Sequence, residues 1–291
     1  DVAPSRGLGD VYKRQVDKVN LSFLANASYV KNEIKNLGNQ TGYIDKESLP
    51  TLGTVSRNEN GYPIGYFFGY KAIGVFQTQE EIDSYISPAT GKPIQPNAAP
   101  GDTKFEDLNG DGVISDDNED RTMIGKPNPD WMVGLTVAAD WNGFDLSAFF
   151  QGSFGADVFD ALRRYELAAV NYTSDALERW TGPGTSNSMP RIVLGDTPKN
   201  FRPSTLLVHD ASFLRLRNLQ VGYTLPAQLT RKAYIQRLRF YASFDNLLTI
   251  TGYKGMDPEI GSTMGIDKGV YPQARVCLLY TSPSPRDGAT S

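Results

Sequence analysis

Apolar and polar residues alternate along several segments of the chain. In the segment 131–140, the apolar residues share one parity: Val133, Leu135, Val137 and Ala139. The same period of two recurs in 19–29, 144–153, 212–225 and 237–245. This period places successive side chains on opposite faces of a β-strand. The pattern therefore predicts an all-β, antiparallel protein, with a hairpin at the turn formed by residues 141–143.

One of these segments is less regular. The apolar residues of 212–225 change parity near Asn218. A β-bulge adds one residue to a strand and shifts the parity of everything after it. We therefore expect a bulge near Asn218.

The connections between the predicted strands differ in length. They are short at 141–143 and 226–234, and long at 36–130, 153–210 and 249–269. Strands of about 10 residues, with short turns at one end and long loops at the other, are typical of an outer-membrane β-barrel. A soluble sandwich or jelly roll alternates in the same way, so the pattern by itself leaves both architectures open.

Composition narrows the function classes. The chain has 29 Lys and Arg against 33 Asp and Glu, a net charge of −4, which argues against nucleic-acid binding. No apolar run approaches the ~20 residues of a transmembrane helix, so a membrane-spanning form would have to be a β-barrel. The single His, His209, cannot form a histidine-based catalytic pair or zinc cluster. No two carboxylates are paired by the sequence as in a glycoside hydrolase, and we expect no enzyme activity.

Both ends of the chain resemble translated sequencing adapter. Residues Cys277 to Asp287 back-translate to an adapter used in transposon-based library preparation. The reverse complement of that adapter, read in one frame, gives Arg6 to Gln15. We therefore expect 1–15 and 277–291 to be adapter-derived and 16–276 to be native. The only cysteine, Cys277, then supports neither a disulfide nor thiol chemistry.

Seven segments, in order along the chain, resemble the SusC/RagA family of TonB-dependent outer-membrane transporters. They include G-Y-P-I-G-Y-F-F-G-Y-K-A-I-G-V-F, D-L-N-G-D-G-V-I, S-F-L-R-L-R-N-L-Q-V-G-Y-T-L-P and D-N-L-L-T-I-T-G-Y-K-G-M-D-P-E. The full set lies at 61–82, 95–114, 121–135, 144–155, 212–226, 245–259 and 271–275. The resemblance covers nearly all of 16–276.

The resemblance implies a fold and a function. It implies the C-terminal strands of a 22-stranded barrel with long extracellular loops, in the outer membrane of a Gram-negative bacterium of the Bacteroidota type. It implies active transport of oligosaccharides or peptides, energised by TonB through an N-terminal region and assisted by a SusD-like surface lipoprotein. The long region 37–130 would then face outward. The alternative is a soluble, secreted, calcium-stiffened β-rich module that binds carbohydrate or acts as an adhesin.

The stretch D-L-N-G-D-G-V-I-S-D-D-N, residues 107–118, resembles a calcium-binding loop. Such loops supply oxygen ligands from positions 1, 3, 5, 7, 9 and 12, with Gly at position 6. The first five are Asp107, Asn109, Asp111, the Val113 carbonyl and Ser115. Position 12 is Asn118, a poor bidentate ligand, so Asp116, Asp117, Glu119 and Asp120 are candidates to close the site. No helical pattern flanks the loop, so we expect structural Ca²⁺ rather than a sensor; a metal-free acidic turn is the alternative.

In a barrel, two further sets of residues acquire roles. Five aromatic residues are candidates for the membrane-interface girdles: Trp131, Trp141, Tyr223, Tyr241 and Phe244. Arg237, Arg239 and Asp245 share one strand parity and would line the polar lumen. In a soluble sheet the same residues would be ordinary packing and solvated charge.

Overall fold

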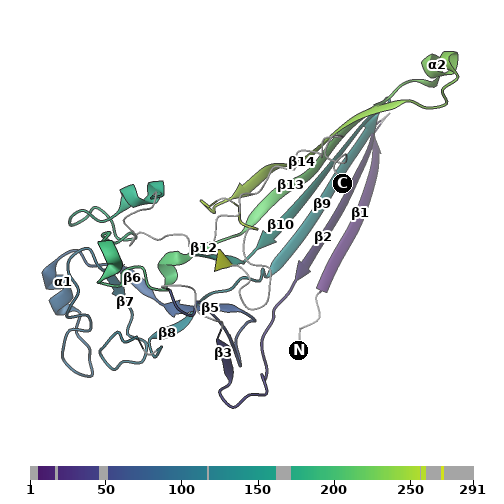
Figure 1. The fold of residues 1–291 in the computed structure, drawn as a ribbon. Helices are drawn as coiled ribbons and strands as arrows, with labels where there is room; N and C mark the ends of the chain where they lie inside the picture. The colour runs from purple at the N-terminus through teal and green to yellow at the C-terminus, as the bar shows by residue number, and fades with distance from the viewer. Residues whose placement is uncertain are drawn as a thin grey trace, which may run out of the picture.

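The computed structural model describes residues 6–16, 19–45, 52–116, 118–161, 172–255, 257–259 and 270–271. It contains a long six-stranded sheet, with a lobe of loops and short strands at one end of that sheet (Figure 1). We call these two parts the long sheet and the lobe. The lobe comprises the described residues within 30–130 and 155–211, together with 270–271.

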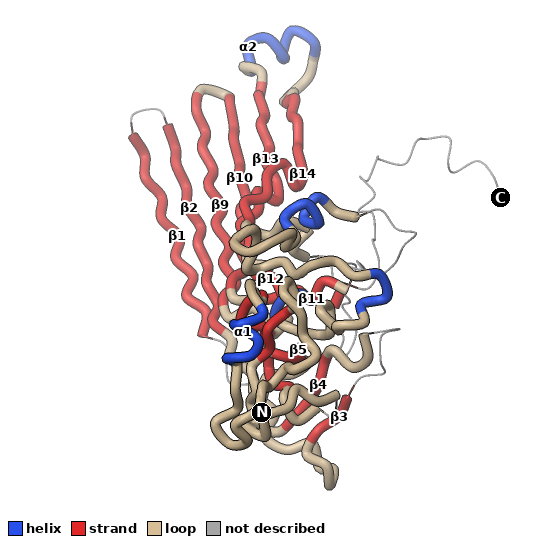
Figure 2. The backbone as a smooth tube through the Cα atoms, turned by 90° about the vertical axis from the view of Figure 1, so that its left-hand side faces the viewer, coloured by secondary structure: helices blue, strands red, loops and turns tan. Residues whose placement is uncertain are grey.

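The strands of the long sheet are antiparallel and run in the order β1–β2–β9–β10–β13–β14. Their bounds are Arg6–Val16 (β1), Val19–Tyr29 (β2), Trp131–Trp141 (β9), Phe144–Phe154 (β10), Phe213–Thr224 (β13) and Arg239–Thr251 (β14). Strands β2, β9, β10, β13 and β14 confirm the strands predicted from the alternating pattern of the sequence. The six strands lie side by side in a single open layer (Figure 2), and β1 and β14 form its two edges among the described strands.

Strand β1 falls in the region expected to be adapter-derived. Its backbone pairs with β2 along the whole strand, from Arg6 opposite Tyr29 to Val16 opposite Val19. Backbone pairing does not test the origin of a sequence, so the assignment of 1–15 stays a prediction. Residues 277–291 lie outside the described residues.

The predicted hairpin at 141–143 joins β9 to β10. Asn142 and Gly143 both have positive φ, at 48° and 88°, as in the tight turns whose twist matches that of the flanking strands. A Cβ on Gly143 would lie 2.8 Å from the carbonyl oxygen of Thr224. Glycine is therefore required here both by the backbone angle and by the closeness of β13.

The predicted bulge in β13 is also confirmed. The pairing register with β14 shifts between Leu216 and Asn218, and the register with β10 shifts opposite Phe149 and Phe150. The extra residue, Arg217, restores the apolar parity on both sides of the irregularity. Leu216 and Leu219 thereby face the same side of the sheet.

The lobe holds the buried core of the described chain. Its strands are β3 (Tyr43–Asp45), β4 (Ser56–Glu59), β5 (Tyr66–Tyr70), β6 (Ala72–Val75), β7 (Thr103–Phe105), β8 (Arg121–Gly125), β11 (Asp157–Asp160), β12 (Val208–Asp210) and β15 (Val270–Tyr271). They form sheets in the orders β3–β4–β5–β8, β6–β7 and β12–β11–β15. Phe67, Phe159 and Leu207 pack together at 0–1% exposure and join the first of these sheets to the third.

Helices are few and short. They are α1 (Gln79–Ser84), α2 (Ala227–Thr230) and the 3₁₀ turns η1 (Ser174–Glu178), η2 (Leu194–Asp196), η3 (Thr205–Leu207) and η4 (Arg231–Ala233). Among the described residues, no helix is long and apolar enough to cross a bilayer. The helix α2 lies in the turn between β13 and β14, at the opposite end of the long sheet from the lobe (Figure 1).

Candidate functional site

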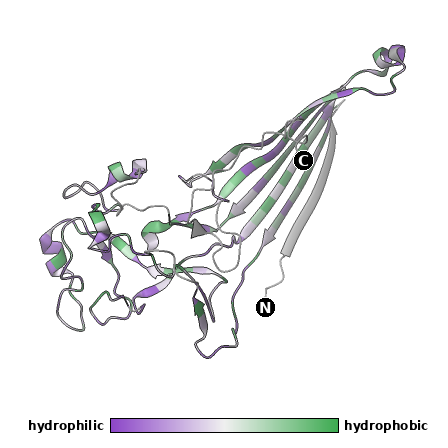
Figure 3. Cartoon of the chain, viewed as in Figure 1, coloured by the Kyte–Doolittle hydropathy of each residue, from purple (hydrophilic) through white to green (hydrophobic). Residues whose placement is uncertain are grey.

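One face of the long sheet is apolar across all strands whose side chains are described. Strand register aligns the apolar residues into rows, of which the middle one is Phe23, Val137, Ala148, Leu219 and Phe244. The alternating hydropathy of the strands is visible in Figure 3. Large side chains on this face remain exposed, for example Phe240 at 61% and Ile250 at 60%. Among the described residues, no second layer covers this apolar face.

Aromatic side chains form a row at each end of the apolar face. At the turn end, Trp141, Phe144 and Tyr223 follow one another on adjacent strands, with ring centroids 6.4 and 4.4 Å apart. At the lobe end, Tyr29 and Trp131 lie 5.0 Å apart. Ten residues of β9 separate the two rows, about 33 Å along a strand. A strand tilted as in an outer-membrane barrel would reduce this to about 25 Å, the height of its apolar band.

The structure shows on which face and in which row each of the five predicted girdle residues lies. Trp131, Trp141 and Tyr223 lie in the two aromatic rows. Phe244 is on the apolar face but in its middle row. Tyr241 is opposite Gly222, which pairs with Asp145, so it lies on the other face and its assignment to a girdle is wrong.

The other face of the long sheet is polar. Arg239 Nε donates to Asp145 Oδ1 at 3.0 Å, and Asn218 Nδ2 donates to Asp245 Oδ1 at 2.7 Å. This confirms that Arg239 and Asp245 lie on the polar face. The polar face also carries Leu24, Met132 and Phe149. The two faces nevertheless differ in overall chemistry, as expected of a wall between lipid and an aqueous lumen.

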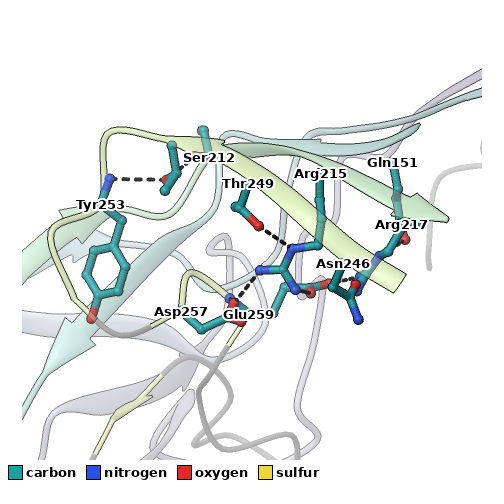
Figure 4. A network of polar contacts seen from close by, with 10 residues as sticks. Gln151, Ser212, Arg215, Arg217, Asn246, Thr249, Tyr253, Asp257 and Glu259 are labelled. Carbon is teal, nitrogen blue, oxygen red and sulfur yellow. Dashed lines mark hydrogen bonds and ion pairs between the residues drawn. The ribbon is translucent and has the colours of Figure 1, made fainter. Parts of the chain in front are cut away.

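Two arginines of β13 organise the polar face at its lobe end (Figure 4). The Arg215 guanidinium donates to Thr249 Oγ1 at 2.9 Å, Asp257 Oδ1 at 2.7 Å and Glu259 Oε2 at 2.6 Å. Its side chain is only 7% exposed. Arg217 also binds Glu259, so one carboxylate joins both guanidinium groups.

Arg217 completes this network with neutral partners. Its Nε donates to Gln151 Oε1 at 2.8 Å and its Nη1 to Asn246 Oδ1 at 3.2 Å. The ion pairs hold the described residues of the segment 252–259, which are 252–255 and 257–259, over the polar face of β13 and β14 (Figure 4). Tyr253 in the same segment packs against Val158 of β11 and Ala211. Sequence reasoning missed this network, although the alternation of Arg215 and Arg217 with leucines indicated that both share one face.

The Asp-rich loop lies in the lobe, away from the polar network. Asp107 accepts hydrogen bonds from the backbone N–H groups of Gly110 at 2.7 Å and Gly112 at 2.9 Å. Asp111 accepts from Val113 N–H at 2.8 Å. Asn109 Nδ2 donates to both Asp111 and Glu119, at 2.9 Å each. Hydrogen bonds therefore join Asn109 to Asp111 and hold Asp107 against the backbone of the same loop. The assignment of these residues as metal ligands stays a prediction.

Asp120 approaches the same loop from its buried side. It is 0% exposed and accepts hydrogen bonds from Leu108 N–H at 3.1 Å and Ser115 N–H at 3.2 Å. Burial raises the pKa of Asp120 above that of an ordinary aspartate. Val113, whose carbonyl is a proposed ligand, is exposed. Asp117, a proposed closing ligand like Asp120, lies outside the described residues. In the described part of the chain, no three carboxylate, imidazole or thiol side chains form a metal-binding group, so Asn109, Ser115 and the Val113 carbonyl would have to supply ligands.

Long-range contacts fix the Asp-rich loop in the lobe. Asp116 forms an ion pair with Lys199, and Tyr70 O–H donates to the Ser115 carbonyl at 2.7 Å. A Cβ on Gly112, whose φ is 87°, would lie 2.7 Å from Ser87 Cβ. Arg121 Nη2 donates to the Phe68 carbonyl at 2.6 Å and anchors the end of the loop to β5. The loop is thus held by three separate parts of the lobe.

Known proteins resemble this chain in sequence and in fold. No family model matches the chain. TonB-dependent receptor P3 of Formosa agariphila is 34% identical over 230 residues, which are 75% of this chain and 22% of the relative. TonB-dependent receptor SusC of Bacteroides thetaiotaomicron is 30% identical over 260 residues, 88% of this chain and 24% of the relative. The chain thus spans about a quarter of the length of the curated relatives it matches.

Solved structures show the same fold. The structure of the RagAB peptide transporter matches with a TM-score of 0.65 and 25% identity, over 91% of this chain and 26% of that one. The RagAB peptide importer in its closed-closed state matches with a TM-score of 0.63 and 26% identity.

Proposed function

We propose that this chain, which belongs to the SusC/RagA family of TonB-dependent receptors, forms part of the barrel wall of an outer-membrane importer. The observation that carries the proposal is the exposed apolar face of the long sheet, bounded by an aromatic row at each end. A soluble protein would cover such a face with a second layer. Here the band has the height of a bilayer core and the opposite face is polar, which fits lipid outside and water inside.

The proposed cargo is an oligosaccharide or a peptide. Its import would be energised through TonB and assisted by a SusD-like lipoprotein that covers the lobe. The kinship with SusC supports this assignment, as does the fold shared with RagAB, which is described as a peptide transporter. The lobe would face the extracellular medium and the turns at 141–143 and 226–234 the periplasm. The chain would bind and conduct its cargo without covalent chemistry.

Spin labels on the two faces of the long sheet test the barrel. In the complete receptor reconstituted in lipid vesicles, nitroxides at Leu135 and Phe240 are expected to be accessible to oxygen and shielded from a water-soluble nickel complex. Labels at Ser147 and Ser243, on the polar face, are matched controls and should show the reverse. Nickel accessibility at Leu135 and Phe240 would instead favour the soluble module.

Import itself is tested in cells. A strain lacking the receptor gene would be offered labelled oligosaccharides and peptides, with and without the restored gene. Uptake of one class should require the gene and stop when a protonophore dissipates the proton-motive force. Gene-dependent uptake that survives the protonophore would contradict a TonB-dependent mechanism.

We further propose that the Asp-rich loop binds Ca²⁺ as a structural clamp of the lobe. The convergence of Asp107, Asn109 and Asp111, with Asp120 behind them, supports this proposal. The expected affinity is that of extracellular calcium modules, with a Kd of about 10⁻⁴–10⁻³ M.

Calorimetric titration of the complete receptor with Ca²⁺ tests the clamp. Asp107→Asn and Asp111→Asn keep the size of each side chain while removing a negative ligand, and each should weaken binding at least tenfold. Asp83→Asn, in the exposed helix α1, is the matched control and should leave binding unchanged. Equal binding by all three variants would place any calcium elsewhere.

A further inference from the structure

A cavity of about 670 Å³ opens in the lobe beside the Asp-rich loop. Three segments form its walls: 90–98, 112–114 and 197–202. Its volume lies within the range of ligand-binding pockets. Lys92 and Val113 on its walls are exposed, so the cavity is accessible from solvent. Nothing in the proposed transport function assigns it a role.

The cavity carries positive charge in a chain that is negative overall. Lys92, Lys199 and Arg202 contribute to its walls, although Lys199 is already paired with Asp116. The carboxylate that also lines it, Asp102, is 2% exposed and bound by Arg191 Nε at 2.6 Å and Asn200 Nδ2 at 3.1 Å. Asp102 is therefore neutralised by its own partners. The lining as a whole favours a negatively charged ligand.

Arg202 is the most constrained of these cations. Its side chain is 14% exposed, and its guanidinium lies over the rings of Tyr70 at 4.7 Å and Phe105 at 5.0 Å. Its Nη1 is 3.8 Å from Asp116 Oδ1, which is beyond hydrogen-bond distance. Its Nε donates to the Lys199 carbonyl at 3.2 Å, whereas Nη1 has no hydrogen-bond partner in the described part of the chain, so the guanidinium retains donor capacity for a carboxylate.

Aliphatic side chains form much of the remaining wall, beside the neutral polar residues Thr90, Gln95, Asn97 and Thr197. Pro93, Ile94, Pro96, Val113 and Pro198 line it, and no aromatic side chain does so among the described residues. A sugar ring would lack a flat aromatic surface on which to stack, whereas prolines and branched side chains fit the aliphatic side chains of a peptide.

We propose that this cavity binds an acidic peptide segment, with an aliphatic side chain against the prolines and a carboxylate at Arg202 and Lys92. The segment would come either from a peptide substrate or from the SusD-like lipoprotein that covers the lobe. The inference rests on the proposed function for the outward position of the lobe. The Asp-rich loop would shape the site, because Val113 and Ile114 belong to its wall.

Fluorescence anisotropy with the complete receptor in detergent tests the proposal. The probe is a labelled acetyl-Leu-Glu-Leu-Glu-amide, and its isostere with Gln in place of Glu is the control ligand. The acidic probe is expected to bind at least tenfold more tightly, and Arg202→Gln to weaken it at least tenfold. Lys71→Gln removes a cation that pairs with Glu106 outside the cavity, and should leave binding unchanged.

A second variant guards against misfolding. Should Arg202→Gln lower the melting temperature, Lys92→Gln, at an exposed position, must still weaken binding about threefold. Adding the purified SusD-like lipoprotein distinguishes a segment of that partner from a peptide substrate. We expect it to displace the probe only when a segment of the lipoprotein itself occupies the cavity. Equal affinity for both probes, unchanged affinity in both variants, or preferential binding of trigalacturonate would overturn the inference. Because binding is measured without transport, such a result would leave the barrel assignment intact.

Discussion

Replacing Arg215 by Met is expected to release the segment 252–259 from the polar face of the long sheet. The substitution leaves Asp257 without its ion-pair partner and Glu259 with only Arg217. Removing one partner of a buried ion pair typically costs about 3–5 kcal/mol, because the remaining charge is left without compensation. Since Arg217 still binds Glu259, we expect a loss of about 3 kcal/mol, the lower end of that range.

Trypsin cleavage after Lys254 measures this release. Lys254 lies between the anchor Tyr253 and the two carboxylates, and a cost of about 3 kcal/mol corresponds to a more than hundredfold larger open population. Arg239→Met is the matched control, because it breaks an ion pair with Asp145 at the opposite end of the same face. Adding Asp257→Asn to Arg215→Met should recover part of the loss by removing the unpaired charge. Cleavage within twofold of the parent protein would show that the ion pairs do not hold the segment.

Arginine placed in the middle of the apolar face should destabilise the folded receptor in lipid. Val137 lies in the middle row, halfway between the two aromatic rows. An arginine on the lipid face near the bilayer midplane costs about 2–4 kcal/mol. Val137→Arg is therefore expected to lower the free energy of unfolding in vesicles by that amount.

The neighbouring Ala138 provides the control for this experiment. It faces the other way, in a row with Ser22 and Ser147, so Ala138→Arg should cost less than about 1 kcal/mol in a water-filled lumen. Urea titration in vesicles, followed by tryptophan fluorescence, compares the two variants. Equal costs would mean that both faces meet the same solvent, which is incompatible with a barrel wall.

Much of the long sheet was predictable because strand geometry is local. A period of two in 131–140 and 144–153 fixed both faces of β9 and β10, and the turn Asn142–Gly143 fixed their register. The parity change near Asn218 identified the bulge for the same reason. Tyr241 was wrongly placed by its residue type, although its parity alone assigns it to the polar face beside Arg239.

The same distinction between local and long-range contacts applies to the candidate sites. The Asp-rich loop was recognisable because Asp107, Asn109 and Asp111 lie within five positions and bond to their own loop. The residues that hold this loop in place were not recognisable, since Asp116 pairs with Lys199, which is 83 positions away in the sequence. The basic cavity joins the segments 90–98, 112–114 and 197–202, and nothing in their sequences indicates that they meet in space.

By itself, the sequence determined five strands of the long sheet (β2, β9, β10, β13 and β14), their two faces, the hairpin and the bulge. Each of these depends on neighbouring residues, whose relative positions are set by the 3.3 Å rise and alternating direction of a strand. Only the tertiary structure decided that Arg215 and Arg217 meet Asp257 and Glu259, and that the lobe encloses a basic cavity. Such contacts depend on how long loops return to the sheet. A loop has no repeating geometry from which its path could be read, and packing of side chains distant in sequence selects one path.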